Sequence, residues 1–162
     1  MAIVIGYGTK LRGDRAAGRA VAEAVSQRAA PGVWTYSVDR LTRAHAEEMT
    51  DEDLVVFVGT YDAGPADPVR VTRVADLSPR GAAHYVDSPE SLLSLFRSRH
   101  GRRPDAWSVL LPATHTDVDE ALSPAAKGKV VEATDTVLGL VHASAVAAPP
   151  PRRTVRELLG IG

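Results

Sequence analysis

The sequence MAIVIGYGTKLRGDRAAG, residues 1–18, contains the pattern that indicates the fold class of the chain. Its β-branched run at residues 3–5 is typical of a strand that is buried on both faces. Gly6 and Gly8 then allow a sharp turn, because glycine adopts positive φ without steric cost. From Asp14 onwards apolar residues recur at helical spacing, and we expect Asp14 to be the N-cap of that helix. A strand, a glycine loop and a helix in this order predict a ligand crevice in an α/β fold.

The composition limits the classes of protein to which the chain can belong. Its 162 residues are enough for one domain with one core. With 19 basic and 20 acidic residues its net charge is −1, which argues against binding to nucleic acid or to a membrane surface. The absence of cysteine excludes disulfides, thiolate metal ligands and a thiol protease. We see no signal peptide and no segment of membrane-spanning length, and we expect a cytoplasmic protein.

Strand and helix patterns alternate along the chain. Strands are predicted at residues 2–6, 33–38, 53–59, 69–74 and 106–112, and helices at residues 14–29, 42–49, 89–100 and from 124 onwards. Residues 53–59 form a nearly continuous apolar run and should be the central strand. Residues 69–74 alternate between apolar and polar or basic side chains, which is typical of a strand near the edge of a sheet. We therefore predict a three-layer α/β/α sandwich with a mostly parallel sheet of about five strands. Its crevice should lie where loops 7–13 and 60–68 meet at one end of the sheet.

The composition changes close to the C-terminus. After Ser144 the chain reads AVAAPPPRR, which is typical of an extended and mobile segment. We expect an α/β domain at residues 1–144 and a Pro/Arg-rich tail at residues 145–162. The closing residues VRELLGI could form one apolar helical turn that docks on the domain or on a partner.

Several motifs resemble those of one known family, the nickel–iron hydrogenase maturation proteases. The motif GYGTKLRGDRAAG is similar to the opening motif of that family, which typically reads glycine-x-glycine-asparagine and then glycine-aspartate-acid-glycine-x-glycine. Similar stretches follow in the same order: RLTRAHAEEM, DLVVFVG, HYVDSPESLLSLFRSRHGRRPDAW and EALSPAAKGKVVEA. The resemblance covers roughly residues 2–142.

The resemblance implies a specific activity. These endopeptidases sense nickel in the precursor of the hydrogenase large subunit and then remove a C-terminal peptide. It also implies three metal ligands: an acidic residue after the first aspartate of the opening motif, an aspartate that ends the third strand, and a histidine before the next helix. Imidazole and carboxylate groups suit a borderline divalent ion such as nickel.

This sequence departs from the family pattern at the ligand positions. Asp14 matches the first aspartate, but Arg15 follows it where the ligand should stand, and Gly59 takes the place of the third-strand aspartate. Thr9 replaces the asparagine of the opening motif, and His84 alone matches a ligand. An arginine stays charged and cannot bind a metal, and one histidine rarely holds a divalent ion. The sequence therefore predicts weak nickel binding or none.

Neighbouring residues offer a substitute site. His84, Asp14 and Asp62 together could form a relocated metal site. The simpler interpretations are that Asp14 and Asp87 cap helices, that Asp62 and Asp67 form turns, and that His84 is an ordinary loop histidine. The other histidines show no metal-binding spacing, and we expect them to be surface residues or helix-end charges: His45, His100, His115 and His142.

Two other enzyme classes fit poorly. A dinucleotide site would use Gly6 and Gly8, but Leu11 occupies the third glycine position, and Asp39 lies beyond the usual spacing for a ribose ligand. A serine hydrolase of the α/β type needs glycine-x-serine-x-glycine, which the sequence lacks.

Two functions remain. One is an active endopeptidase with the relocated metal site, for which nickel is the possible cofactor. The other is a non-catalytic relative without a cofactor, which binds a hydrogenase large-subunit precursor or another protein through its crevice. The crevice residues would be Gly6, Gly8, Thr9, Arg12 and Arg15, and the two arginines could bind a peptide carboxylate or simply be solvated. The loss of two of the three ligands favours the non-catalytic relative.

Overall fold

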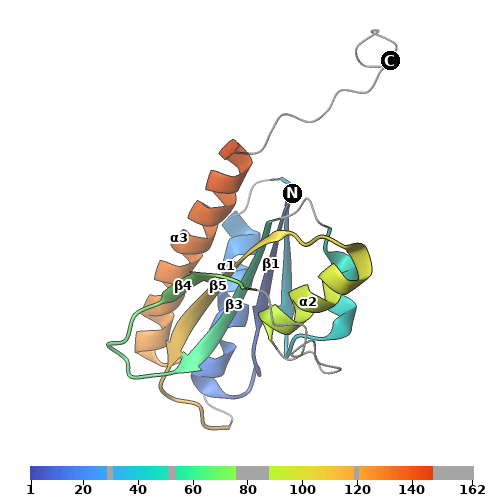
Figure 1. The fold of residues 1–162 in the computed structure, drawn as a ribbon. Helices are drawn as coiled ribbons and strands as arrows, with labels where there is room; N and C mark the ends of the chain where they lie inside the picture. The colour runs from blue at the N-terminus through green and yellow to red at the C-terminus, as the bar shows by residue number, and fades with distance from the viewer. Residues whose placement is uncertain (29–30, 51–53, 76–87, 119–120, 148–162) are drawn as a thin grey trace, which may run out of the picture.

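The computed structural model describes residues 1–28, 31–50, 54–75, 88–118 and 121–147 (Figure 1). One five-stranded sheet has the strand order β2-β1-β3-β5-β4. The strands are β1 (Ala2–Tyr7), β2 (Val33–Val38), β3 (Leu54–Asp62), β4 (Arg70–Arg73) and β5 (Asp105–Ala113). The helical segments are η1 (Gly13–Ala16), α1 (Ala17–Arg28), η2 (Arg43–Glu48), α2 (Pro89–His100) and α3 (Pro124–Ala147).

The sheet lies between two helical layers, as predicted (Figure 1). Alternate residues of β3 face opposite layers: Val56 and Val58 pack with α1 and α3, whereas Val55 and Phe57 pack with η2 and α2. All four of these side chains are fully buried. Burial on both faces explains why this strand reads as one apolar run and not as an alternating pattern.

The sheet is mostly parallel, which confirms the predicted fold class. The central strand β3 pairs in parallel with β1 and β5, and β2 pairs in parallel with β1. The short edge strand β4 is antiparallel to β5, and its four residues are exposed. This exposure fits the alternating sequence that predicted an edge position.

One predicted boundary of the central strand is wrong. Residues 60–62 were expected in a loop, but β3 continues to Asp62, and these residues pair with Leu111, Pro112 and Ala113 of β5. The long partner strand supplies hydrogen bonds that override the local loop signal of the prolines and glycine that follow. The connecting loop therefore begins at Ala63, whose N–H group donates to the carbonyl oxygen of Ala113 at the end of β5.

Helix boundaries follow the capping signals closely. The hydroxyl of Ser88 accepts a hydrogen bond from Ser91 N at 3.2 Å, and Gly101 ends α2 in the left-handed conformation with φ of 73°. The helix after Pro124 forms as predicted but continues to Ala147, so residues 145–147 belong to it and not to an extended tail. The remaining tail lies outside the described residues.

No helix in the described part of the chain has the length and apolar character needed to cross a membrane.

Candidate functional site

The candidate site lies at the carboxyl ends of β1 and β3, where the sheet order reverses direction. From β1 the chain moves outward to β2 and then returns past β1 to β3. The two loops follow neighbouring parallel strands and so lie at the same end of the sheet, as predicted, and Arg15 on η1 contacts Asp62 at the end of β3. Ligands of open α/β sheets bind at such a switch point.

The glycines of the opening motif allow close contact between backbones. A Cβ atom at Gly6 would lie 2.2 Å from the carbonyl oxygen of Gly18, and one at Gly18 would lie 2.3 Å from that of Val58. Gly8 has a φ of 145°, and a Cβ there would lie 2.0 Å from the carbonyl oxygen of Arg15. Gly6 is buried beneath α1, so the expectation that it lines an accessible crevice is wrong.

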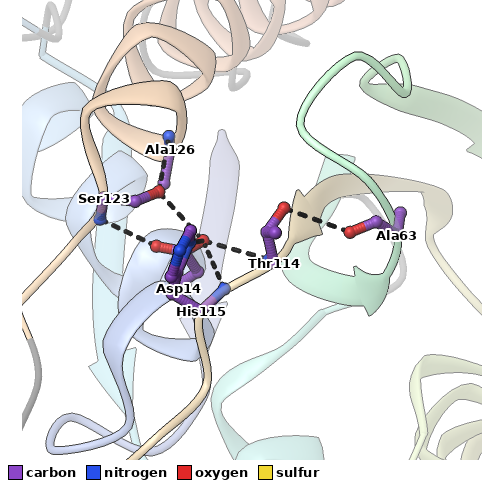
Figure 2. Close-up of polar contacts among 6 residues, drawn as sticks. All are labelled: Asp14, Ala63, Thr114, His115, Ser123 and Ala126. Atoms are coloured by element: carbon purple, nitrogen blue, oxygen red, sulfur yellow. Dashed lines mark hydrogen bonds and ion pairs between the residues drawn. The ribbon is translucent and has the colours of Figure 1, made fainter.

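Asp14 is buried, with 1% of its surface exposed. Its carboxylate accepts hydrogen bonds from the backbone N–H groups of Thr114 at 3.0 Å, His115 at 3.1 Å and Ser123 at 2.8 Å. The hydroxyl of Ser123 donates a further bond at 3.0 Å (Figure 2). All four donors belong to the segment between β5 and α3, so Asp14 connects η1 to that segment.

This arrangement corrects the expected role of Asp14 as the cap of its own helix. The residue lies inside η1, and no side chain caps that segment. Asp14 instead supports the start of α3, because the Ser123 hydroxyl that it holds accepts a hydrogen bond from Ala126 N at 3.2 Å (Figure 2). The aspartate therefore has a structural role in joining two distant parts of the chain.

The hydrogen bonds also control the charge of Asp14. Burial on its own would raise the pKa of this carboxyl, but the bonds from Ser123, His115 and Thr114 lower it below its ordinary value of 3.8. The carboxylate is thus ionised at neutral pH. Its oxygens are already engaged by four donors, which leaves it poorly suited to a metal ion.

Arg15 points away from this network and forms an ion pair with Asp62. Its Nη2 atom lies 3.0 Å from Asp62 Oδ1, and the two side chains are 37% and 77% exposed. The pair joins η1 to the end of β3. Asp62 lies in the strand and not in a turn, whereas Asp67 forms the expected turn by accepting a hydrogen bond from Gly64 N at 2.7 Å.

Tyr7 is a site residue that the sequence reasoning missed. A Cβ atom at Gly59 would lie 2.5 Å from Cζ and 2.6 Å from the hydroxyl oxygen of Tyr7. The ring therefore fills the space beside Gly59 that a side chain at that position would need. Gly6 pairs with Val58, so the next residues along the two parallel strands, Tyr7 and Gly59, lie side by side. A glycine next to a large residue on the neighbouring strand is the signal that could have revealed this contact.

The phenol of Tyr7 is neutral at physiological pH. Burial, with a smaller contribution from the charge of Glu90, raises its pKa from 10.0 to about 12. The ring packs with the apolar cluster between the sheet and α2. It is therefore not available as a phenolate ligand.

The remaining predicted site residues lie apart from this centre or outside the described chain. Thr9 and Arg12 are exposed on the loop after β1. His84 and Asp87 fall outside the described residues. Among the residues that are described, no group of three or more His, Asp or Glu side chains is arranged to hold a metal ion.

The prediction that His45 is a surface residue or a helix-end charge is wrong. His45 is buried, and its Nδ1 atom accepts a hydrogen bond from Thr42 N at 2.9 Å at the start of η2. The side chains of His100, His115 and His142 are exposed, as expected. Asp39 forms an ion pair with Arg19 at 2.5 Å, so the group considered for a ribose ligand has a protein partner.

The architecture matches a set of solved structures. An endopeptidase from Escherichia coli aligns with a TM-score of 0.69 at 21% identity, over 89% of this chain and 94% of that one. The hydrogenase maturating endopeptidase HybD from E. coli gives 0.68 at 20% identity, over 88% and 93%. This chain has the fold of the hydrogenase maturation proteases. The maturation protease HycI from Thermococcus kodakarensis KOD1 agrees, with 0.67 at 19% identity over 87% and 92%.

The structural likeness confirms the resemblance drawn from the sequence motifs at the level of the fold. No protein-family model matches the chain, and no curated protein sequence matches it. Three-dimensional architecture is therefore similar where overall sequence has diverged.

At two positions where the sequence resemblance implies metal ligands, this chain carries no side chain that can bind a metal. Arg15 brings a positive charge to one expected ligand position, and Tyr7 covers Gly59 at another. An arginine offers only donors, and a glycine offers no side chain.

Proposed function

We propose that this protein is a non-catalytic relative of the hydrogenase maturation proteases that binds a protein partner at the carboxyl end of its sheet. The observation that carries the proposal is the Arg15–Asp62 ion pair, which joins η1 to the end of β3 at the carboxyl end of the sheet. A carboxylate at residue 15 would attract a cation, whereas the guanidinium repels one. With an effective dielectric constant of about 20, a divalent ion about 5 Å from an unpaired guanidinium would be destabilised by about 7 kcal/mol, and the Asp62 carboxylate offsets part of this repulsion.

The relocated metal site of His84, Asp14 and Asp62 is less well supported. To bind a metal, Asp14 would have to give up hydrogen bonds from Thr114, His115 and Ser123. Asp62 would also have to leave its ion pair with Arg15. Each change removes an interaction that the fold already makes, so we favour the partner-binding function.

The exposed loop after β1 is the proposed contact surface. Thr9 and Arg12 are exposed, and the side chain of Leu11 between them is 61% exposed. Val118, on the segment that Asp14 holds, is 59% exposed. A basic and apolar loop of this kind suits a peptide segment that carries a carboxylate. The partner we propose is the precursor of a hydrogenase large subunit, which the family resemblance implies.

The test combines binding with cleavage. Calorimetry should detect binding of the purified chain to a hydrogenase large-subunit precursor that retains its C-terminal peptide. Arg12→Glu should weaken binding at least tenfold. Arg28→Glu is the matched control, because it makes the same charge change at the far end of α1, and it should have little effect.

The cleavage assay distinguishes the two functions. With nickel present, the precursor should keep its full length when mixed with this chain, while the maturation protease HybD cuts its own precursor in parallel. Nickel-dependent cleavage by this chain that disappears in His84→Ala would overturn the proposal in favour of an active endopeptidase. Failure of Arg12→Glu to weaken binding would show that the partner contacts another surface.

A further inference from the structure

We infer that Tyr7 and Gly59 form a matched pair, in which the tyrosine ring fills the space of a metal ligand and keeps that position closed to a side chain and an ion. This inference rests on the proposed function, because it explains why the proposed non-catalytic protein would hold no metal at this end of the sheet. It adds a residue that belongs to none of the three expected ligand positions.

The geometry shows why the two residues depend on each other. The ring carbons Cζ and Cε2 and the hydroxyl oxygen of Tyr7 would all lie within 2.9 Å of a Cβ atom at Gly59. Such contacts are shorter than any that a real Cβ atom makes, so a side chain at residue 59 forces the ring to move. The ring packs with the apolar cluster that contains Ile5 and Leu92, and moving it would expose part of that cluster.

The ring also adds to the contact between the ends of β1 and β3. Tyr7 fills the space between β1 and β3, and the Arg15–Asp62 ion pair joins η1 to β3. Both contacts lie at the carboxyl end of the sheet.

A double-mutant cycle on thermal stability tests the matched pair directly. Gly59→Ala should lower the melting temperature by roughly 5 °C when Tyr7 is present, because overpacking forces the ring out. The same substitution should have little effect in the Tyr7→Ala background, where the space is open. Gly64→Ala is the control glycine substitution, since its nearest neighbour is a side-chain oxygen at 3.5 Å, and it should behave alike in both backgrounds. Equal losses for Gly59→Ala in the two backgrounds would overturn the inference.

A nickel titration tests the consequence for metal binding. We compare Arg15→Glu/Gly59→Asp with the triple variant that also carries Tyr7→Ala. The triple variant should bind nickel at least tenfold more tightly than the double variant. Equal affinities of the double and triple variants, or no binding by the triple variant, would overturn the role of Tyr7 in excluding the ion.

The two proposals can fail separately. Binding of nickel by the unaltered chain that depends on His84 would contradict the non-catalytic function without changing the stability cycle. An additive stability cycle would contradict the Tyr7–Gly59 pair without changing the assay of precursor binding. If a multiple variant does not fold, as judged by circular dichroism, the Gly59→Ala cycle alone decides whether Tyr7 and Gly59 form a matched pair.

Discussion

Asp14 and Arg15 are neighbours in η1, yet they lie in opposite kinds of environment. Asp14 is almost fully buried and receives four hydrogen bonds from the segment between β5 and α3. Arg15 is partly exposed, and its ion-pair partner Asp62 is mostly in solvent. One turn of backbone therefore supports both a buried polar network and an exposed charge pair.

The comparison shows which of the two residues the fold constrains more strongly. Replacing Asp14 would leave several buried N–H groups without an acceptor, which is costly whatever the protein does. Replacing the residue at position 15 disturbs only surface groups. The fold therefore constrains the residue at position 15 less than it constrains Asp14.

The largest expected effect is that of Asp14→Ala. It leaves the N–H groups of Thr114, His115 and Ser123 unpaired, and we expect a loss of about 3–4 kcal/mol in the free energy of unfolding. Urea denaturation measures this loss. Asp62→Ala is the control, since it removes an exposed carboxylate. A loss below about 1 kcal/mol for Asp14→Ala would contradict a structural role for the buried network.

Acid should remove part of the same stabilisation. Because the pKa of Asp14 is lower in the folded chain than its ordinary value of 3.8, the unfolded chain takes up a proton first as the pH falls. The contribution of Asp14 is present above pH 3.8 and is lost as the pH falls through the lower folded pKa. Urea titrations between pH 6 and about 3 should therefore show a steeper decline for the unaltered chain than for Asp14→Asn. Identical slopes would show that this carboxyl does not cause the decline.

Ser123→Ala should have the next largest effect, because its hydroxyl both donates to Asp14 and accepts from Ala126 N. We expect a loss of about 2 kcal/mol, at the upper end for a helix cap. Ser88→Ala removes the other serine cap, which has no buried carboxylate partner, and should cost about 1 kcal/mol. If the two variants lose equal stability, the bond to Asp14 adds nothing to the cap of α3.

The smallest expected effect is that of separating Arg15 from Asp62. Both side chains are well solvated, so Arg15→Ala and Asp62→Ala should each change the free energy of unfolding by less than about 1 kcal/mol. Their coupling in a double-mutant cycle should be about 0.5 kcal/mol or less. A coupling several times larger would mean that this ion pair stabilises the loops as strongly as the buried network does.

Much of the fold follows from local features of the sequence. The apolar run from Leu54 predicted a central strand, and Ser88 and Gly101 set the ends of α2. These signals work because a strand buried on both faces needs an unbroken apolar run, and a helix end needs a capping residue beside it. Both features are found among residues close in the chain. The end of β3 was missed because pairing with β5, a distant strand, decides where that strand stops.

The candidate site divides in the same way. The sequence by itself determined that Arg15 and Gly59 stand where the family resemblance implies metal ligands, because residue identity alone decides which side chains can bind a metal. Only the tertiary structure decided that Asp14 accepts bonds from residues about a hundred positions away, that Arg15 pairs with Asp62, and that Tyr7 fills the space at Gly59. These contacts join β1, β3 and the start of α3, and strand order and register, which no local pattern encodes, bring those segments together.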